Sequence, residues 1–392
     1  MEFKFSKQEE LWQWAIREFA EGELSKQEFM TLDHMPADIL KKMGELGFFS
    51  VKVPKEYGGN PGTWVMVAML AEEIAKMNTS LAYRTLVSYE INLLLAEHGT
   101  DEAKEEWLRS LVNGSKQGCL SVSEPDFGVD VSANKTEAIR EEDSYFIRGE
   151  KSPVSFGMQA EVALLFARTN SEKRTAGLTA FLVPLGLSGI TRSSIKNMGL
   201  FPVAPSSLTM DQVCIPAKYR IGDEGEGFHL HTHMGFSSDF HRIMSGLISL
   251  GAAQAAMRLA IAYSKQRVAF GRPIAKFEAI SEKIAEGATL IEAGRWLCYR
   301  ALWLKDQGKP NAKEAAMCGW WCPKVAFQVI EHALLIHGHT GYSDDLPLQQ
   351  MLRDIVAFEM IAGTEGILKQ TIAQKVIGNI AVPDVMTDSI KD

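Results

Sequence analysis

A single turn is the most specific guide to the fold of this chain, and it reads Gln266-Arg267-Val268-Ala269-Phe270-Gly271-Arg272-Pro273-Ile274. The turn lies between two long segments whose apolar residues recur at helical spacing. An arginine guanidinium suits a pyrophosphate, and an aromatic ring suits stacking on a flat ligand. In isolation, Arg267 would more often be a surface cation, so its interpretation depends on the rest of the chain.

The chain divides into three regions with different patterns of apolar residues, and the turn lies in the third. Apolar residues recur at helical spacing up to residue 118, short β-branched and aromatic runs follow in residues 119–227, and long amphipathic segments occupy residues 228–392. We therefore expect a helical domain, an antiparallel β domain and a second helical domain, with these boundaries. The long segments expected to be helical are Ser245–Lys265, Ala279–Gln307, Ala312–Ile336 and Leu348–Ile377.

Composition narrows the class of protein. The net charge is -8 and no dense Lys/Arg run appears, which argues against nucleic acid as a partner. The N-terminus lacks the features of a signal peptide, and the apolar window Ile243 to Tyr263 suits a helix buried among helices better than one in lipid. Five cysteines argue for a reducing cytoplasm rather than a disulfide framework. We expect a cytoplasmic protein without membrane partners.

Four further motifs accompany the turn. They are Ser123-Glu-Pro-Asp-Phe-Gly-Val-Asp-Val131, Asp239-Phe-His-Arg242, Gly338-His-Thr-Gly-Tyr342, and Arg353-Asp354 followed by Met360-Ile-Ala-Gly-Thr-Glu365. Together they resemble the acyl-CoA dehydrogenase family over nearly the whole chain. The turn matches that family's R-x-x-F-G-x-P-I. The resemblance implies an α+β fold with an N-terminal helical domain, a central antiparallel β domain and a C-terminal four-helix bundle.

The same resemblance implies FAD as cofactor and an acyl-CoA thioester as substrate, with no metal. In the family, the Arg and Phe of the turn meet FAD across a subunit boundary, so we expect a homotetramer, and an electron-transfer flavoprotein as electron acceptor. The expected FAD contacts are Leu120, Val122, Ser123, Gly128, Val129, Pro153, Ser155, Arg267, Phe270, Phe277, Glu278, Leu335, Gly338, His339, Thr364 and Gly366. The expected substrate contacts are Val129, Asp239, His241, Arg242 and Gly363.

Several of these positions depart from the family pattern. Pro153 stands where many members place a Trp against the flavin, although Ser155 keeps a hydroxyl suited to the flavin ring. Val129 replaces a Ser, Leu335 replaces a Gln and His339 replaces a Gly.

The most consequential departure is Ala362, at the position of the family's catalytic Glu. The family reaction removes a proton from the carbon next to the thioester as hydride leaves the next carbon for the flavin, and alanine cannot take a proton. Some members carry the Glu at the position occupied here by His241, which is again no carboxylate, although a histidine can act as a base.

Glu90 is the remaining candidate for the base. It lies in the apolar run Leu86-Val-Ser-Tyr-Glu-Ile-Asn-Leu-Leu-Leu-Ala96, on the segment that lines the acyl pocket in the family. Burial there would raise its pKa towards the useful range. Alternatively, Glu90 points to solvent or pairs with Arg84. Members acting on cyclohexene-type carbonyl-CoA thioesters resemble this arrangement, so we expect an alicyclic acyl-CoA. Glu365 is a weaker candidate.

Three alternatives remain open from sequence. Flavin monooxygenases that share the acyl-CoA dehydrogenase fold need no Glu at position 362, although Asp239 and Arg242 argue against this alternative. The chain is also consistent with a partner subunit or scaffold that has lost its base. Finally, His229, His231 and His233 alternate as strand neighbours would and offer metal ligands, but polar residues after a Gly-rich turn are the simpler interpretation.

Overall fold

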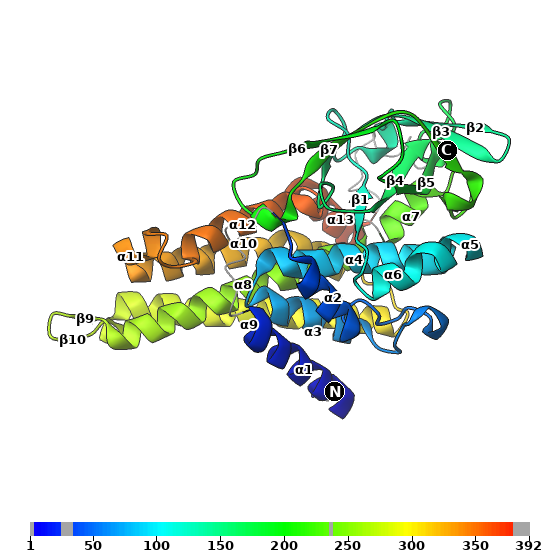
Figure 1. Cartoon of the computed structure of the whole chain (residues 1–392). Coiled ribbons are helices and arrows are strands. Elements are labelled where there is room, and N and C mark those ends of the chain that lie inside the picture. The colour runs from blue at the N-terminus through cyan, green and yellow to red at the C-terminus, as the bar shows by residue number, and fades with distance from the viewer. Residues whose placement is uncertain (1–3, 25–33, 235–237, 379–392) are drawn as a thin grey trace.

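The computed structural model describes residues 4–24, 34–234 and 238–378. Figure 1 shows a layer of N-terminal helices beneath a β domain, and a bundle of long helices that projects to one side as an arm. The α+β architecture predicted from sequence is confirmed.

The N-terminal helices pack around one almost wholly buried helix, α4 (Thr79–His98). Asn78 starts α4 by accepting a hydrogen bond from the Leu81 backbone N–H, and the helix stops before Gly99. Ser6 and Glu9 form a capping box at the start of the first helix. The helices of this region are α1 (Lys7–Glu23), α2 (Ala37–Glu45), α3 (Trp64–Ala75), α4, α5 (Asp101–Ala103) and α6 (Arg109–Val112).

The central domain is an eight-stranded sheet in which seven strands follow the order β6-β7-β3-β2-β4-β5-β8, while β1 pairs with β4. Most strand pairs are antiparallel, as expected, but β1 and β2 each pair with β4 in parallel, so the sheet is mixed at β4. The chain reaches β1 from the helical domain and returns to the sheet only later, which permits a parallel pair. The strands are β1 (Gly118–Ser121), β2 (Glu137–Glu141), β3 (Ser144–Val154), β4 (Val162–Arg168), β5 (Leu178–Pro184), β6 (Ile190–Ser194), β7 (Ser206–Pro216) and β8 (Arg220–Ile221).

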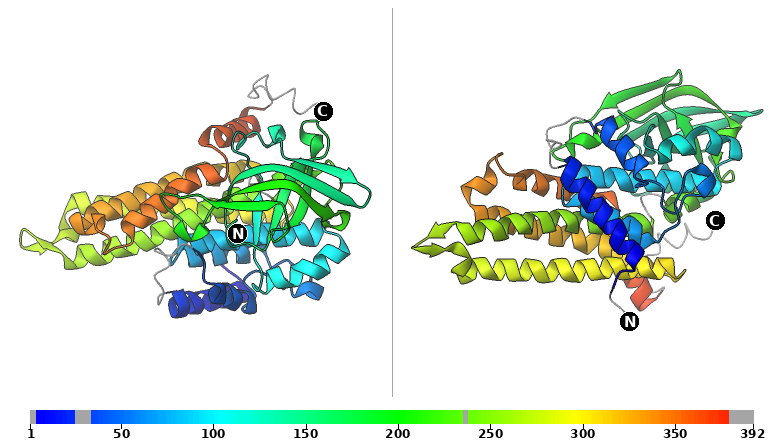
Figure 2. Two further views of the ribbon diagram at one scale, coloured as in Figure 1. Left: turned by 45° about the horizontal axis from the view of Figure 1, so that its top comes forward. Right: turned by 60° about the horizontal axis from the view of Figure 1, so that its bottom comes forward.

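Four long C-terminal helices run side by side, as both views in Figure 2 show: α8 (Asp239–Gln266), α9 (Glu278–Asp306), α10 (Ala312–His337) and α12 (Leu348–Ile361). The other helices of this region are α7 (Gly227–Met234), α11 (His339–Tyr342) and α13 (Glu365–Ile377). The segment expected as one helix from Leu348 to Ile377 is broken at residues 362–364, because Gly363 has a φ of 103° and cannot continue a helix. This break lies at the position of the missing catalytic Glu.

Helix α8 passes through the centre of the molecule. It is long and apolar enough to cross a membrane by length and composition alone, yet 83% of its most apolar window is buried inside the protein. Small residues allow this packing: a Cβ at Gly251 would lie 2.6 Å from the backbone oxygen of Glu72 on α3. The prediction of a helix buried among helices therefore agrees with the structure.

The turn from Gln266 to Ile274 forms a two-stranded hairpin at the end of the arm, with β9 (Val268–Ala269) paired to β10 (Arg272–Pro273) (Figure 1). Phe270 and Gly271 form the connecting turn with φ angles of 48° and 75°. Left-handed backbone at both positions is typical of tight hairpin turns but is rare for an aromatic residue. The Phe270 side chain is 96% exposed.

The three histidines do not form a strand. His229 and His231 lie on α7, where His231 is buried against the ring of Phe166, and the side chain of His233 lies outside the described residues. The part of the chain that the structure describes contains no group of three or more His, Cys, Asp or Glu residues arranged to hold a metal ion.

Candidate active site

Glu90 lies in the middle of α4 and contacts His241 in the first turn of α8. Its Oε1 lies 2.7 Å from Nδ1 of His241, and both side chains are 0% exposed. The burial of Glu90 agrees with the expectation of a carboxyl group inside an apolar helix. Arg84, the alternative partner, does not pair with Glu90, because its guanidinium donates to the backbone oxygen of Gly118 at 2.7 Å. Hence Glu90 faces α8 rather than solvent or Arg84.

The environment of Glu90 favours a carboxyl group that titrates above its usual range. Burial raises the pKa of Glu90, and the charge and hydrogen bond of His241 partly oppose that rise. The second oxygen, Oε2, is buried and has no hydrogen-bond partner among the described residues. Removing one member of a buried pair typically costs about 3–5 kcal/mol of stability. Carboxyl groups whose pKa is shifted by burial and by a specific partner are common at functional sites, so Glu90 is a candidate for the base.

An aromatic cluster, consisting of Tyr83, Phe156 and Phe358, adjoins this pair. The ring of Tyr83 lies 5.7 Å from each of the other two rings and 6.3 Å from that of His241, measured between centroids. All three aromatic side chains are buried. Sequence reasoning missed this cluster, although residues 83 and 90 are seven apart and lie on the same face of α4.

Tyr83 also links α4 to the β domain. Its hydroxyl lies 3.4 Å from Oγ of Ser155, which immediately follows β3. Ser155 is one of the residues expected to contact the flavin ring. The aromatic cluster thus joins Glu90 and His241 to the predicted flavin position.

Ala362 is the C-cap of α12, is 0% exposed, and lies one turn after Phe358. No carboxylate replaces it locally: Glu365 pairs with Lys324 at 2.6 Å and with Lys369. Gly363 takes a left-handed backbone, and Thr364 precedes the first residue of α13. The usual site of the base is therefore an apolar helix end.

Asp239 and Arg242 belong to the first turn of α8, whose start is capped by Ser238. Their side chains lie 3.5 Å apart, and that of Arg242 is only 12% exposed. Burial raises the pKa of Asp239 and lowers the pKa of Arg242, while the two charges oppose these shifts. Nε of Arg242 is buried and has no partner among the residues described. A half-buried cation with a spare donor suits a polar or anionic part of a ligand.

The predicted FAD contacts of the β domain lie at the ends of β1 and β3 and in the segments that follow them. Leu120 and Val122 are buried, Ser123 and Ser155 are half-buried, and Val129 and Pro153 are exposed. Nζ of Lys151 lies 2.9 Å from both the Val122 backbone oxygen and a carboxylate oxygen of Glu124, which braces the Ser123 turn. A Cβ on Gly128 would meet nothing within 4 Å, so packing within this chain does not require glycine there.

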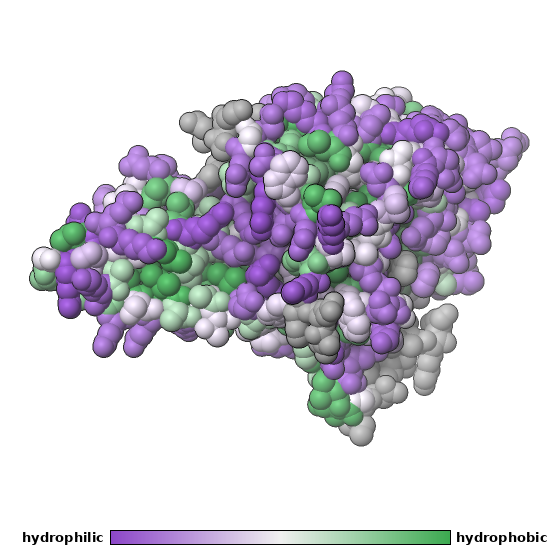
Figure 3. Space-filling model, turned by 90° about the horizontal axis from the view of Figure 1, so that it is seen from below, coloured by the Kyte–Doolittle hydropathy of each residue, from purple (hydrophilic) through white to green (hydrophobic). Residues whose placement is uncertain are grey.

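A second set of predicted FAD contacts lies on the arm, away from the β domain (Figure 1). Besides Arg267 and Phe270, it contains Phe277, Glu278, Leu335, Gly338 and His339. Leu335 is 57% exposed, and Figure 3 shows apolar side chains among charged ones along the arm. Thr364 and Gly366, at the start of α13, are exposed. The exposed apolar side chains and the buried Ser121 hydroxyl, which has no partner among the described residues, fit a bound cofactor.

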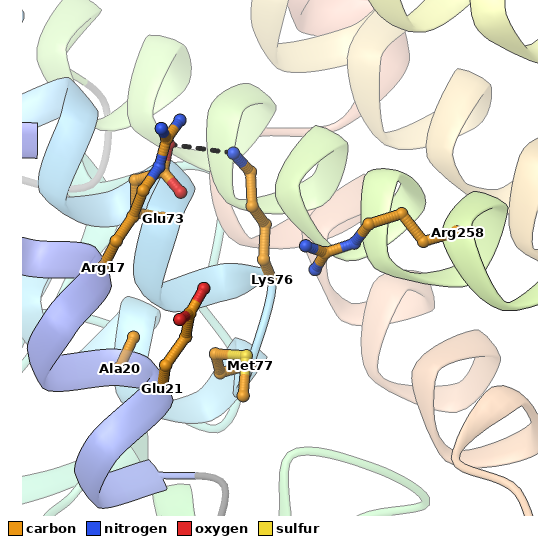
Figure 4. Close-up of a pocket in the computed structure, with 7 residues that line it drawn as sticks. All are labelled: Arg17, Ala20, Glu21, Glu73, Lys76, Met77 and Arg258. Atoms are coloured by element: carbon orange, nitrogen blue, oxygen red, sulfur yellow. Dashed lines mark hydrogen bonds and ion pairs between the residues drawn. The ribbon is translucent and has the colours of Figure 1, made fainter. Parts of the chain in front are cut away.

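A cavity of about 250 Å³ lies elsewhere, where α1, α3 and α8 meet (Figure 4). Lys76 and Arg17 both pair with Glu73 there, at 2.9 Å and 2.8 Å, and Arg258 reaches in from α8. None of the predicted site residues lines this cavity. The ion pairs around the cavity join α1 to α3, and the cavity is separate from the candidate active site.

The described geometry fits one family. Residues 6–115, 119–213 and 225–377 match the N-terminal, middle and C-terminal domains of acyl-CoA dehydrogenase. The chain therefore belongs to the acyl-CoA dehydrogenase family. It is a FAD-dependent oxidoreductase that acts on acyl-CoA.

Three relatives illustrate the range of similarity. The chain is 32% identical to the short-chain-specific acyl-CoA dehydrogenase of Clostridium acetobutylicum, over 96% of this chain and 100% of the relative. It is 31% identical to a subunit of the caffeyl-CoA reductase–Etf complex of Acetobacterium woodii, over 94% and 98%. The solved structure of butyryl-CoA dehydrogenase from Megasphaera elsdenii superposes with a TM-score of 0.91, at 30% identity over 96% and 100%.

Proposed function

We propose that this protein dehydrogenates an alicyclic, already unsaturated acyl-CoA of the cyclohexene-carbonyl type, with Glu90 as the proton acceptor. One observation carries the proposal: the buried carboxylate is on α4 at Glu90, while the usual position holds the methyl group of Ala362. A base moved from the thioester carbon towards the wall of the acyl pocket suits removal of a proton from a more distant ring carbon.

The residues divide the work as follows. FAD, when bound, supplies the hydride acceptor. Glu90 takes the proton from one ring carbon, the two electrons of that C–H bond stay in the ring to form the new C=C bond, and a hydride leaves from another ring carbon with the electron pair of its own C–H bond. Asp239 and Arg242 would hold the polar part of the thioester, and the Ser155 hydroxyl would hydrogen-bond the flavin ring.

The aromatic cluster supports a ring-shaped substrate. The ring of Tyr83 packs against Phe156, Phe358 and the imidazole of His241 that contacts Glu90, and such rigid walls complement a flat or gently puckered ring better than a flexible chain. The relatives' names point instead to short-chain substrates, since they include a short-chain-specific enzyme and a butyryl-CoA dehydrogenase. A direct comparison of thioesters decides between the two.

The test is reduction of the bound flavin, followed by absorbance, with cyclohexene-carbonyl-CoA and with butanoyl-CoA. We expect the cyclic thioester to bleach the wild-type flavin and Glu90→Gln to slow this bleaching by roughly 10²–10⁴-fold while FAD and thioester still bind. Glu97→Gln is the matched control, because Glu97 lies on the same helix but is exposed. Bleaching of Glu90→Gln at the wild-type rate, or no bleaching by any cyclic thioester, would contradict the proposal.

We also propose a cytoplasmic homotetramer that passes electrons to an electron-transfer flavoprotein. The exposed Phe270 at the end of the arm supports an assembly in which the hairpin meets a neighbouring subunit. The similarity to a subunit of a reductase–Etf complex supports the electron acceptor. Size-exclusion chromatography with light scattering tests the first part, and reoxidation of the reduced enzyme by a purified electron-transfer flavoprotein tests the second.

A further inference from the structure

We propose that His241 is a positioning residue for the base: its Nδ1–H donates to Oε1 of Glu90, which fixes the carboxylate and leaves Oε2 to take the substrate proton. This inference rests on the proposed role of Glu90. It adds a second residue, on a different helix, to the proton-transfer step.

The geometry supports a fixed pair. The 2.7 Å contact joins α4 to α8, and both side chains are fully buried, so water does not compete for it. The backbone N–H of His241 donates to Oγ of Ser238 at 3.0 Å, which anchors the first turn of α8. The ring of Tyr83 stands at 89° to the imidazole, with 6.3 Å between the ring centroids, which is an edge-to-face arrangement. The imidazole is thus held by its own helix and by its neighbour on α4.

The roles of the two oxygens follow from what each contacts. Oε1 is occupied by the histidine, whereas Oε2 is buried without a hydrogen-bond partner in the described ranges. An ionised carboxylate accepts hydrogen bonds and cannot donate them, so the histidine nitrogen must carry the proton when Glu90 is the base. The bond stabilises the ionised form and offsets part of the cost of burial. A histidine at this position therefore lowers the pKa of the buried base relative to the same carboxyl group without that hydrogen bond.

The surrounding groups do not replace this function. Burial raises the pKa of Tyr83, which stays neutral, and lowers the pKa of His231 on α7 to about 3, so that it also stays neutral. Arg242 lies one residue further along α8 and pairs with Asp239. Among the described residues, His241 is the hydrogen-bond donor that reaches the Glu90 carboxyl group.

The first test is the pH dependence of flavin reduction by cyclohexene-carbonyl-CoA in three proteins. His241→Leu removes the donor at similar size, whereas His241→Asn keeps an N–H donor near the position of Nδ1. We expect the acid limb of the wild-type profile to move to higher pH by roughly one unit in His241→Leu, which is about tenfold in rate below the limb. His241→Asn should restore most of the wild-type profile.

The second test needs no turnover. The C=O stretch of protonated Glu90, identified in the infrared difference between wild type and Glu90→Gln, should titrate at higher pH in His241→Leu than in wild type. FAD content and thermal unfolding of each variant report whether it folds. If His241→Leu folds but leaves both the acid limb and the infrared titration unchanged, the positioning role is wrong.

The outcomes separate this inference from the proposed function. Full activity in Glu90→Gln overturns the proposed function itself, whatever the histidine variants do. Loss of activity in Glu90→Gln with an unshifted profile in His241→Leu overturns only the positioning role. A rate loss in His241→Leu that is equal at every pH also contradicts it, because a merely structural defect has no reason to move with the protonation of Glu90.

Discussion

The carboxylate of Asp354 on α12 accepts a hydrogen bond from the backbone N–H of Leu200 at 2.6 Å, and this bond ties the β domain to the helix that ends at Ala362. A Cβ on Gly199 would lie 2.8 Å from both the backbone nitrogen and Oδ1 of Asp354, so the two segments are in close contact. The domain that carries Ser155 and the helix that carries Phe358 are thereby held in register on either side of Tyr83.

This contact predicts a pH-dependent stability. Burial raises the pKa of Asp354 to about 6, although hydrogen bonds from Leu200 and Gln350 oppose the rise. A raised carboxyl pKa contributes stability that is fully present below the unfolded value near 4 and is lost as pH rises through 6. Asp354→Asn keeps the acceptor for Leu200 without the charge. Its free energy of unfolding should therefore exceed that of wild type by an amount that grows between pH 4 and 6, to about 3 kcal/mol.

Denaturant unfolding from pH 4.5 to 7.5 measures this difference. Asp344→Asn is the control, because Asp344 is an exposed acid in the same part of the chain. A constant difference between Asp354→Asn and wild type across the range would show that the Asp354 carboxyl group does not titrate there.

Ala362 predicts weak action on straight-chain saturated thioesters. Butanoyl-CoA and octanoyl-CoA present their acidic proton next to the thioester, where this chain has only a methyl group. We expect Ala362→Glu to gain reduction of the flavin by butanoyl-CoA, and Ala362→Gln, its isosteric control, to gain none. Rapid bleaching of the wild-type flavin by butanoyl-CoA would contradict this prediction.

The hairpin predicts a role in cofactor retention between subunits. Arg267 and Phe270 are both exposed and lie on the projecting hairpin, so their removal should disturb the fold of a single chain very little. We expect Arg267→Ala to lower the FAD content per chain or to loosen the oligomer, as measured by absorbance and light scattering. Arg272→Ala is the control, since Arg272 lies in the same hairpin and stacks on Phe277 within the chain. Unchanged FAD content and oligomeric state in Arg267→Ala would count against the shared site.

The aromatic cluster predicts substrate selectivity. Truncating Tyr83 to Ala opens space beside Glu90 and removes the contact with Ser155, at a stability cost of roughly 3–5 kcal/mol, as for large aromatic core residues. We expect the preference for cyclic over straight-chain thioesters to fall, and Tyr83→Phe, which keeps the ring, to retain that preference. Equal selectivity in Tyr83→Ala and wild type would exclude the ring of Tyr83 as a selectivity determinant.

The sequence by itself determined the family and most of the architecture. Two motifs carried most of this information: the turn from Gln266 to Ile274 and the segment from Ser123 to Val131. Such motifs reflect local backbone conformation, for example the left-handed pair at Phe270 and Gly271, and local conformation depends on a few consecutive residues. The periodicity of apolar residues predicted the long helices and most strands, because it too depends only on consecutive residues. The parallel pairing of β1 with β4 and the break of the last helix at Gly363 depended on partners or backbone geometry that periodicity does not report.

Only the tertiary structure decided what Glu90 faces. Sequence identified it as an ionisable residue in an apolar helix and offered solvent or Arg84 as alternatives, because neighbours along one helix are all that a sequence displays. The partner, His241, is 151 residues away along the chain and meets Glu90 only because α8 crosses α4 in the core. The same packing brings Phe358 and Phe156 to Tyr83. Contacts between distant segments arise from how helices pack, and this packing assembles the candidate site around the position that Ala362 leaves apolar.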